Sequence, residues 1–167
     1  MKWIGTTIFL LIANLVQAAD QPVVSSQEIA EGLYLLQGRG GNVLASMGSD
    51  GLLLIDDDYA ELAPAYEDAL GKLGKDMPHY VINTHWHGDH AGGNTFWGER
   101  GAIIVAHDNV RKRVSNDQNN AFFGRTTPAM APSGWPVVSY ADSMALHFNY
   151  DTLQLQHYPN GHTDGDT

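Results

Sequence analysis

Three histidines and one aspartate crowd into the six-residue segment from His85 to His90. Where a strand gives way to a loop, positions two apart face the same side, so His85 and His87 can converge on one ion. Imidazole nitrogens bind zinc at about 2.0–2.1 Å. Asp89 and His90 lie one step further along the loop, where they can reach a second ion about 3.5–4 Å from the first. The cluster indicates a metal site rather than a polar surface loop, because nothing structural requires it.

Two ions at this spacing can share a hydroxide and clamp a substrate oxygen, which is chemistry suited to hydrolysis. In such a site Asp89 would hold metal and hydroxide and accept a proton, so it is the candidate catalytic residue. Glycines support the same interpretation. Gly88 permits a tight turn, and Gly92 and Gly93 let the backbone approach closely behind the metals.

A further histidine, His162, lies in the last motif of the chain, residues 161–166. One more imidazole would complete the three-histidine set typical of a catalytic zinc, which keeps an open position for water. Alone, His162 would more often be a capping or surface residue, but together with the upstream cluster it becomes a candidate ligand. We interpret Thr163, Asp164 and Asp166 as turn-forming groups or as groups that support a ligand.

Three aspartates follow the continuous apolar run Leu52–Ile55. Asp56 would stand at the end of a buried strand, where its carboxylate could accept the far N–H of a ligand histidine and orient the ring. The alternative is that Asp56, Asp57 and Asp58 form a solvated turn. The sequence favours neither reading over the other.

Short strands closed by glycine turns must position these residues. Leu33–Gln37 and Asn42–Met47 indicate an antiparallel meander, whereas Leu52–Ile55 and Tyr80–Asn83 have the apolar character of strands buried on both faces. A helix is expected between the last two, with a proline in its first turn, one apolar face and a closing glycine: Pro64, Tyr66, Ala69, Leu70, Leu73 and Gly74.

Downstream we expect a short helix over Asn94–Trp97, a strand over Ala102–Ala106, and a helix over Asp108–Ser115 that is capped by Asp108. A loop flanking the active site, Asn116–Pro136, should follow. Two paired strands, Leu146–Tyr150 and Leu153–Tyr158, come last. The order of strands and helices indicates an α/β domain.

The histidine loop, from Asn83 to Asn94, resembles the signature loop of the metallo-β-lactamase superfamily. Leu54–Asp56 resembles the strand-end aspartate of that family, and Gly161–Thr167 resembles its third-histidine segment. The match runs from about Ile29 to the last residue. The resemblance implies an αββα sandwich, an α/β fold in four layers, with metal ions at its edge.

The resemblance further implies a ligand set. His85, His87 and His162 would hold one ion, and Asp89 and His90 would hold a second, giving two zinc ions per complete domain, with iron as an alternative metal. The family fold has two similar halves, and we expect this sequence to contain mainly the N-terminal one. A Gly-Asp or cysteine segment and a late histidine are expected in the missing half, so the short chain should be poorly soluble and hold at most one zinc firmly.

Residues 1–18 are predicted to be a secretory signal peptide. Lys2 is followed by the apolar stretch Trp3–Val16, which is too short and too interrupted for a typical transmembrane helix. The small residues that signal peptidases require before the cleavage site place cleavage after Ala18 or after Ala19. An uncleaved anchor is the alternative. Residues 19–28 would form an extended leader, and residues 29–167 one metallo-β-lactamase-like domain. We therefore expect a secreted or periplasmic protein with no stable membrane anchor after cleavage.

The charge composition limits the class of substrate that the protein can be expected to bind. Lys and Arg number 9 against 19 Asp and Glu, for a net charge of −10, which disfavours nucleic-acid binding and leaves a small-molecule substrate. The leading hypothesis is a zinc-dependent hydrolase that attacks an ester, thioester, lactone or lactam carbonyl with a metal-bound hydroxide. Family membership does not fix the substrate. The alternatives are an iron-dependent redox enzyme of the same fold and an inactive metal-binding remnant.

Overall fold

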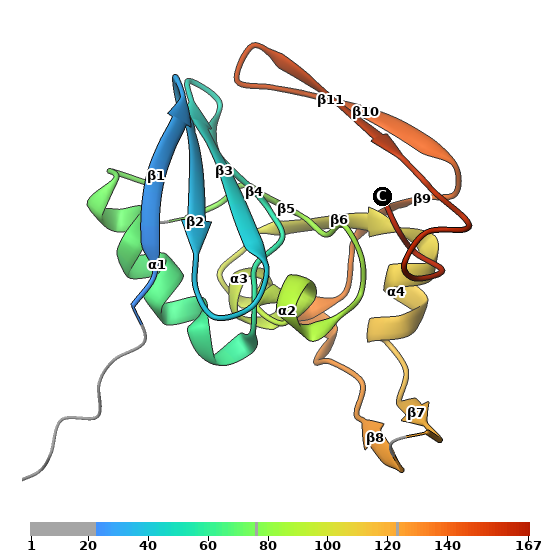
Figure 1. The fold of residues 1–167 in the computed structure, drawn as a ribbon. Helices are drawn as coiled ribbons and strands as arrows, with labels where there is room; N and C mark the ends of the chain where they lie inside the picture. The colour runs from blue at the N-terminus through green and yellow to red at the C-terminus, as the bar shows by residue number, and fades with distance from the viewer. Residues whose placement is uncertain (1–22, 76, 123) are drawn as a thin grey trace, which may run out of the picture.

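A seven-stranded mixed sheet organises the computed structural model, which describes residues 23–75, 77–122 and 124–167 (Figure 1). The sheet order is β1-β2-β3-β4-β5-β6-β9. The first four strands pair antiparallel, and β4, β5, β6 and β9 pair parallel. The strands are β1 (Ser25–Ala30), β2 (Leu33–Gln37), β3 (Asn42–Gly48), β4 (Gly51–Ile55), β5 (Tyr80–Ile82), β6 (Ile103–His107) and β9 (Val138–Tyr140). The meander and the two buried strands are confirmed.

The edge strand β1 was not expected from the sequence. The predicted signal peptide and the start of the leader lie outside the described residues, but the last four leader residues, 25–28, belong to β1. Every residue of β1 is exposed. A strand without a buried face lacks the apolar alternation by which strands are recognised, so its sequence resembles an extended leader.

One helical layer covers one face of the sheet. Helix α1 (Ala63–Lys72) has Pro64 in its first turn and is followed by Gly74 at φ +91°, as predicted. Its buried face packs with Trp97 of α3 (Asn94–Glu99) against Leu52 and Leu54 of β4. Figure 1 shows α1 and α3 on the same side of the sheet. The remaining α-helices are α2 (Gly88–Ala91) and α4 (Asp108–Val114).

A two-stranded antiparallel sheet covers the other face. It consists of β10 (Ser143–Phe148) and β11 (Asp151–Gln156), which confirms the predicted strand pair with the turn at residues 149–150. Leu155 packs there against Leu53 of β4. Because side chains alternate along a strand, Leu53 faces this sheet while Leu52 and Leu54 face the helices. The apolar run of β4 is therefore buried on both sides, as expected for a strand between two layers.

Two local expectations need correction. Asp108 does not cap α4. The cap is His107, whose Nδ1 accepts the backbone N–H of Asn109 at 3.2 Å, and Asp108 lies in the first turn. The segment Asn116–Pro136 is also not structureless, because it contains a small hairpin and a short 3-10 turn: β7 (Gln118–Asn120), β8 (Arg125–Thr127) and Pro132–Gly134. Polar hairpins without apolar alternation give little sequence signal.

Among residues 23–75, 77–122 and 124–167, no helix has the length and apolarity that crossing a membrane requires.

Candidate metal centre

The histidine loop begins where the parallel strand β5 ends. Asn83 is fully buried, and its side chain exchanges hydrogen bonds of 2.8 and 2.9 Å with Asn94, which ties the start of the loop to α3. His85 and His87 follow, and α2 starts at Gly88. The carboxyl ends of parallel strands are where ligand sites of such sheets form. The local sequence therefore delivers two imidazoles to the functional edge of the sheet.

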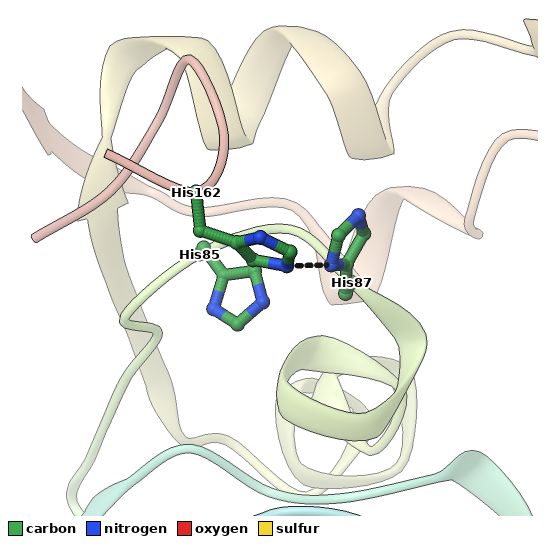
Figure 2. Close-up of side chains that lie close together, drawn as sticks. All are labelled: His85, His87 and His162. Atoms are coloured by element: carbon green, nitrogen blue, oxygen red, sulfur yellow. Dashed lines mark hydrogen bonds between the residues drawn. The ribbon is translucent and has the colours of Figure 1, made fainter. Parts of the chain in front are cut away.

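Three imidazoles, from segments far apart in the sequence, meet at this edge. His162 lies in the loop after β11, and its Nε2 is 3.1 Å from Nδ1 of His87 (Figure 2). One ring nitrogen each from His85, His87 and His162 lies within 4.8 Å of the others. In tetrahedral zinc sites, bonds of about 2.0–2.1 Å put ligand nitrogens roughly 3.4 Å apart. The three side chains therefore lie close enough together to be candidate ligands of one ion.

The protonation of these rings favours metal binding. Burial lowers the pKa of His85, with the neighbouring His90 as the next cause. Burial likewise lowers the pKa of His87, with His162 as the next cause. A ligand imidazole must be neutral, so a lowered pKa keeps its lone pair available to a lower pH than for an ordinary histidine.

Asp56 orients His90. The Asp56 Oδ2 accepts a hydrogen bond of 2.7 Å from Nδ1 of His90, and this bond is the main reason that the pKa of His90 is raised. The same carboxylate accepts the backbone N–H of Thr84 at 2.7 Å and its hydroxyl at 2.8 Å. It thus binds both ends of the histidine loop.

The solvated-turn interpretation of the three aspartates is wrong. Asp56, Asp57 and Asp58 are 4%, 1% and 0% exposed. Asp58 accepts the Tyr66 hydroxyl at 2.9 Å, and Asp57 accepts the backbone N–H of Gly93 at 2.9 Å. Burial raises the pKa of Asp57 well above its usual range. A run of polar residues normally marks a surface turn, so only the tertiary contacts reveal this buried carboxylate cluster.

Asp89 lies on α2 beside the histidines. Its Oδ2 is 3.5 Å from Nε2 of His90, and its side chain is 37% exposed. The rings of His85 and His90 have centroids 4.1 Å apart. The structure therefore brings all five predicted ligands and Asp56 to one place, with the three-histidine group as the most compact part.

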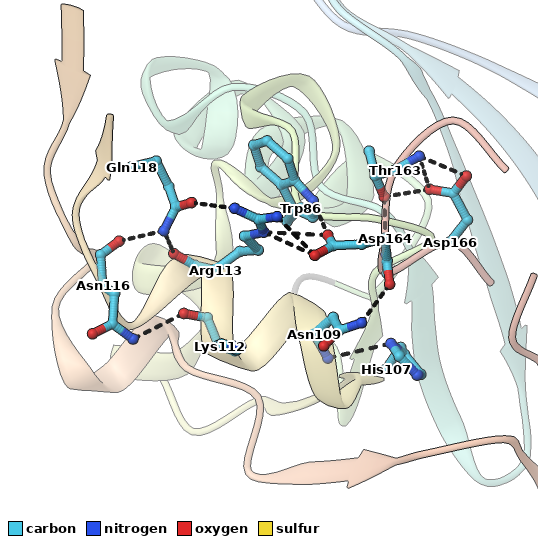
Figure 3. Close-up of polar contacts among 11 residues, drawn as sticks. Trp86, His107, Asn109, Lys112, Arg113, Asn116, Gln118, Thr163, Asp164 and Asp166 are labelled. Atoms are coloured by element: carbon cyan, nitrogen blue, oxygen red, sulfur yellow. Dashed lines mark hydrogen bonds and ion pairs between the residues drawn. The ribbon is translucent and has the colours of Figure 1, made fainter. Parts of the chain in front are cut away.

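A clamp around Asp164 holds the loop that carries His162 (Figure 3). Arg113 of α4 donates to the Asp164 carboxylate from Nη2 at 2.8 Å and from Nε at 3.1 Å. The Trp86 indole N–H donates to the same carboxylate at 3.1 Å. The Asn109 side chain donates to the Asp164 carbonyl at 2.6 Å. Because Trp86 stands between His85 and His87, this clamp joins the two histidine-bearing loops directly. The sequence indicated a supporting role for Asp164 but not its partners.

We expect Asp164→Ala to weaken zinc binding by about 10- to 100-fold, the usual cost of losing a group that orients a ligand. Both members of the Arg113 pair are about two-fifths exposed, so the free energy of unfolding should change by less than about 1 kcal/mol. Competition with a chelating dye measures the affinity. Glu67→Ala, which breaks a similarly exposed ion pair with Arg100, is the control. Equal zinc affinity in both variants would contradict the clamp.

Comparison with known proteins supports the assignment of the fold. The family model of the metallo-β-lactamase superfamily matches residues 34–136, more than half of the chain. A metallo-β-lactamase from Cronobacter sakazakii superposes with a TM-score of 0.75 at 21% identity, over 87% of this chain and 57% of that one. A metallo-β-lactamase from Legionella gormanii gives 0.73 at 20% identity, over 89% and 58%. A subclass B3 enzyme of Bradyrhizobium japonicum gives 0.71 at 22% identity, over 87% and 56%.

The α/β fold and the family match together define one class of protein, that of the metallo-β-lactamase fold. The chain belongs to the metallo-β-lactamase superfamily. It spans a little more than half the length of the solved structures named above. It is also 38% identical, over 63 residues, to the coenzyme F420H(2) oxidase of Methanothermobacter marburgensis, covering 35% of this chain and 16% of the oxidase.

Proposed function

We propose that this chain carries the metal centre of a zinc-dependent hydrolase that acts on an ester, thioester, lactone or lactam carbonyl. The observation that carries the proposal is the approach of three ring nitrogens, from His85, His87 and His162, to within 4.8 Å of one another. When bound, zinc would supply a Lewis acid that makes water a nucleophile near neutral pH and stabilises negative charge on a carbonyl oxygen.

Each residue then has a defined task. His85, His87 and His162 would hold the first ion. His90 donates Nδ1–H to Asp56, which leaves Nε2 free to bind a second ion beside Asp89. Asp89 is partly exposed, and its Oδ2 lies 3.5 Å from Nε2 of His90, so its carboxylate would help hold the second ion and could accept a proton.

The solved relatives make β-lactams the first substrates to test, since several carry the name metallo-β-lactamase. At about 20% identity that likeness concerns the fold, and the superfamily fold supports several reactions. Esters, thioesters and lactones present the same electrophilic carbonyl and stay beside lactams as candidates.

An iron-dependent redox enzyme is the second candidate. The observation that favours it is the local identity to an F420H(2) oxidase. Imidazole and carboxylate ligands bind iron as well as zinc, so the residues alone are compatible with both metals. The metal that the protein carries after purification separates the two.

The test is to purify the natural protein that carries this sequence and measure its metals by elemental analysis. We expect zinc, and we expect metal-stripped protein to regain turnover of a chromogenic lactam, a lactone or a thioester when zinc is added. Turnover should be lost in His162→Ala. Iron in the purified protein, together with oxidase activity and no hydrolysis, would replace the hydrolase by the redox enzyme.

A further inference from the structure

The loop that carries His162 contains a chemically reactive pair of residues. Asn160 is followed by Gly161, and it is the only asparagine in the sequence that precedes a glycine. Glycine has no Cβ to shield its backbone nitrogen, so that nitrogen can reach the side-chain carbonyl carbon of the asparagine before it. Asparagine is also one of the thermolabile residues of proteins. Because the pair lies directly before His162, a change in its backbone acts on a candidate metal ligand.

The surroundings of this pair leave it accessible. Asn160 and Gly161 are both exposed. Within the part of the chain that the structure describes, no hydrogen bond holds the Asn160 side chain. The Gly161 N–H donates to the Tyr158 carbonyl at 3.1 Å and closes a tight turn. Attack by the Gly161 nitrogen therefore requires this turn to open, and exposed loops open at a small cost in free energy.

The packing of Asp166 explains why a glycine stands at position 161. A Cβ there would lie 2.2 Å from the Asp166 Oδ2. That carboxylate accepts the backbone N–H of Thr163 with both oxygens at 2.9 Å, which shapes the turn after His162 (Figure 3). A larger residue at position 161 would displace Asp166. The geometry that places His162 thus requires the same glycine that makes Asn160 reactive.

An Asp-Gly pair in the same loop provides an internal comparison, because aspartate can form the same five-membered ring with a following glycine. Asp164 is held by Arg113 at 2.8 Å and by the Trp86 indole at 3.1 Å. An ionised carboxylate is a poor electrophile, and these contacts keep it from turning toward the backbone. Gly165 is also buried. The reactive pair of this loop is therefore the exposed one, which contains the asparagine.

We propose that Asn160–Gly161 is a site of spontaneous deamidation that disables the metal centre. A base removes the Gly161 amide proton, and the nitrogen attacks Cγ of Asn160. A new C–N bond closes a succinimide ring while the bond to the side-chain nitrogen breaks and ammonia leaves. Water then adds to one of the two ring carbonyls and opens the ring, which gives aspartate or isoaspartate at position 160. No oxidant or reductant takes part.

Isoaspartate changes the length of the loop. Its main chain runs through Cβ, which adds one carbon and roughly 1.5 Å to the backbone. The loop is held before the site by the Tyr158 N–H, which bonds to the Asp166 carbonyl at 3.0 Å, and after it by the Asp164 clamp. Metal–ligand distances tolerate only about 0.2 Å, so His162 leaves the three-histidine group. This consequence rests on the proposed metal centre, whereas the deamidation itself does not.

The bound metal should protect the site. Zinc held by His162 stabilises the closed turn, and a ligand that binds only the closed form lowers the population of the open one. Metal-free protein is therefore the form that deamidates.

The first test follows the modification itself. The natural protein, with and without zinc, is incubated under mildly alkaline conditions. Peptide mapping by mass spectrometry and labelling with isoaspartyl methyltransferase locate the products. We expect aspartate and isoaspartate at position 160 in the metal-free protein, far ahead of the exposed Asn42, which precedes a valine. Asn160→Gln, which would need a larger ring, should stay unmodified. Deamidation at position 160 no faster than at Asn42 would overturn the site.

Zinc should slow the reaction at position 160 by about 10-fold or more if it keeps the turn closed. Equal rates with and without bound zinc would show that the metal does not hold this loop.

The second test compares zinc affinities by calorimetry. Protein with isoaspartate at position 160, separated by ion exchange, should bind zinc at least about 10-fold more weakly than fresh protein, as when a group that orients a ligand is lost. Asn160→Asp, which adds the charge without the extra carbon, should bind zinc as fresh protein does. Asn160→Gln incubated in parallel should keep its affinity. Equal affinity of the fresh and isoaspartate forms, or an equal loss in Asn160→Asp, would contradict displacement of His162 by the lengthened loop. If fresh protein binds no zinc, the proposed function is wrong and the deamidation site stands.

Discussion

His87→Ala should lower the affinity of the protein for zinc by at least about 100-fold and remove hydrolytic turnover. Complete zinc sites contribute roughly 10–16 kcal/mol of binding free energy, so one of three histidines accounts for a large part of it. The fold should survive, because the His87 side chain makes no capping hydrogen bond to α2. Its hydrogen bond is to His162, which is exposed.

The matched control is His147→Ala. His147 is exposed on β10, and its side chain is hydrogen-bonded to Thr152 of the neighbouring hairpin strand. Calorimetric titration with zinc measures the affinity, and circular dichroism of the metal-free proteins verifies folding. Unchanged zinc affinity in folded His87→Ala would show that the three histidines do not form the metal centre.

Gly92→Ala should cost about 3 kcal/mol or more of unfolding free energy and lower the Tm by roughly 6–12 °C. A Cβ at position 92 would come within 2.3 Å of the Gly88 carbonyl oxygen and 2.7 Å of the Asp58 carbonyl oxygen. Both are backbone atoms, so no side chain can rotate away. The histidine loop would have to move off the β4 end, and zinc binding should weaken with stability.

Gly88→Ala tests the same loop without the clash. A Cβ at position 88 would make only ordinary contact, 3.9 Å from the Tyr59 ring, and alanine favours the start of α2 more than glycine does. Scanning calorimetry of both metal-free variants provides the comparison. If Gly92→Ala is as stable as Gly88→Ala, the close approach behind the metal centre is not a constraint.

The sequence alone was sufficient to predict that the histidines of the loop cluster and which strands are buried. His85, His87, Asp89 and His90 sit in one short segment, so local geometry brings them together whatever the rest of the chain does. The apolar runs of β4 and β5 likewise reveal burial on both faces, because exposing either face would be costly. The close backbone approach at Gly92 was also predictable from the sequence, because only a glycine permits it.

Other features depended on contacts between residues far apart in the chain. The sequence left open whether the aspartates at 56–58 were solvated, and the packing of the histidine loop and α1 against them buried all three. Strand β1 lacks an apolar face and is recognised only by its pairing with β2. His162 was a candidate ligand by its motif, but its approach to His87 is a contact of the folded chain, next to the Asp164 contacts with Arg113 and Trp86. Local patterns determine which residues can bind a metal, whereas the ion pairs and packing of the folded chain determine which of them meet.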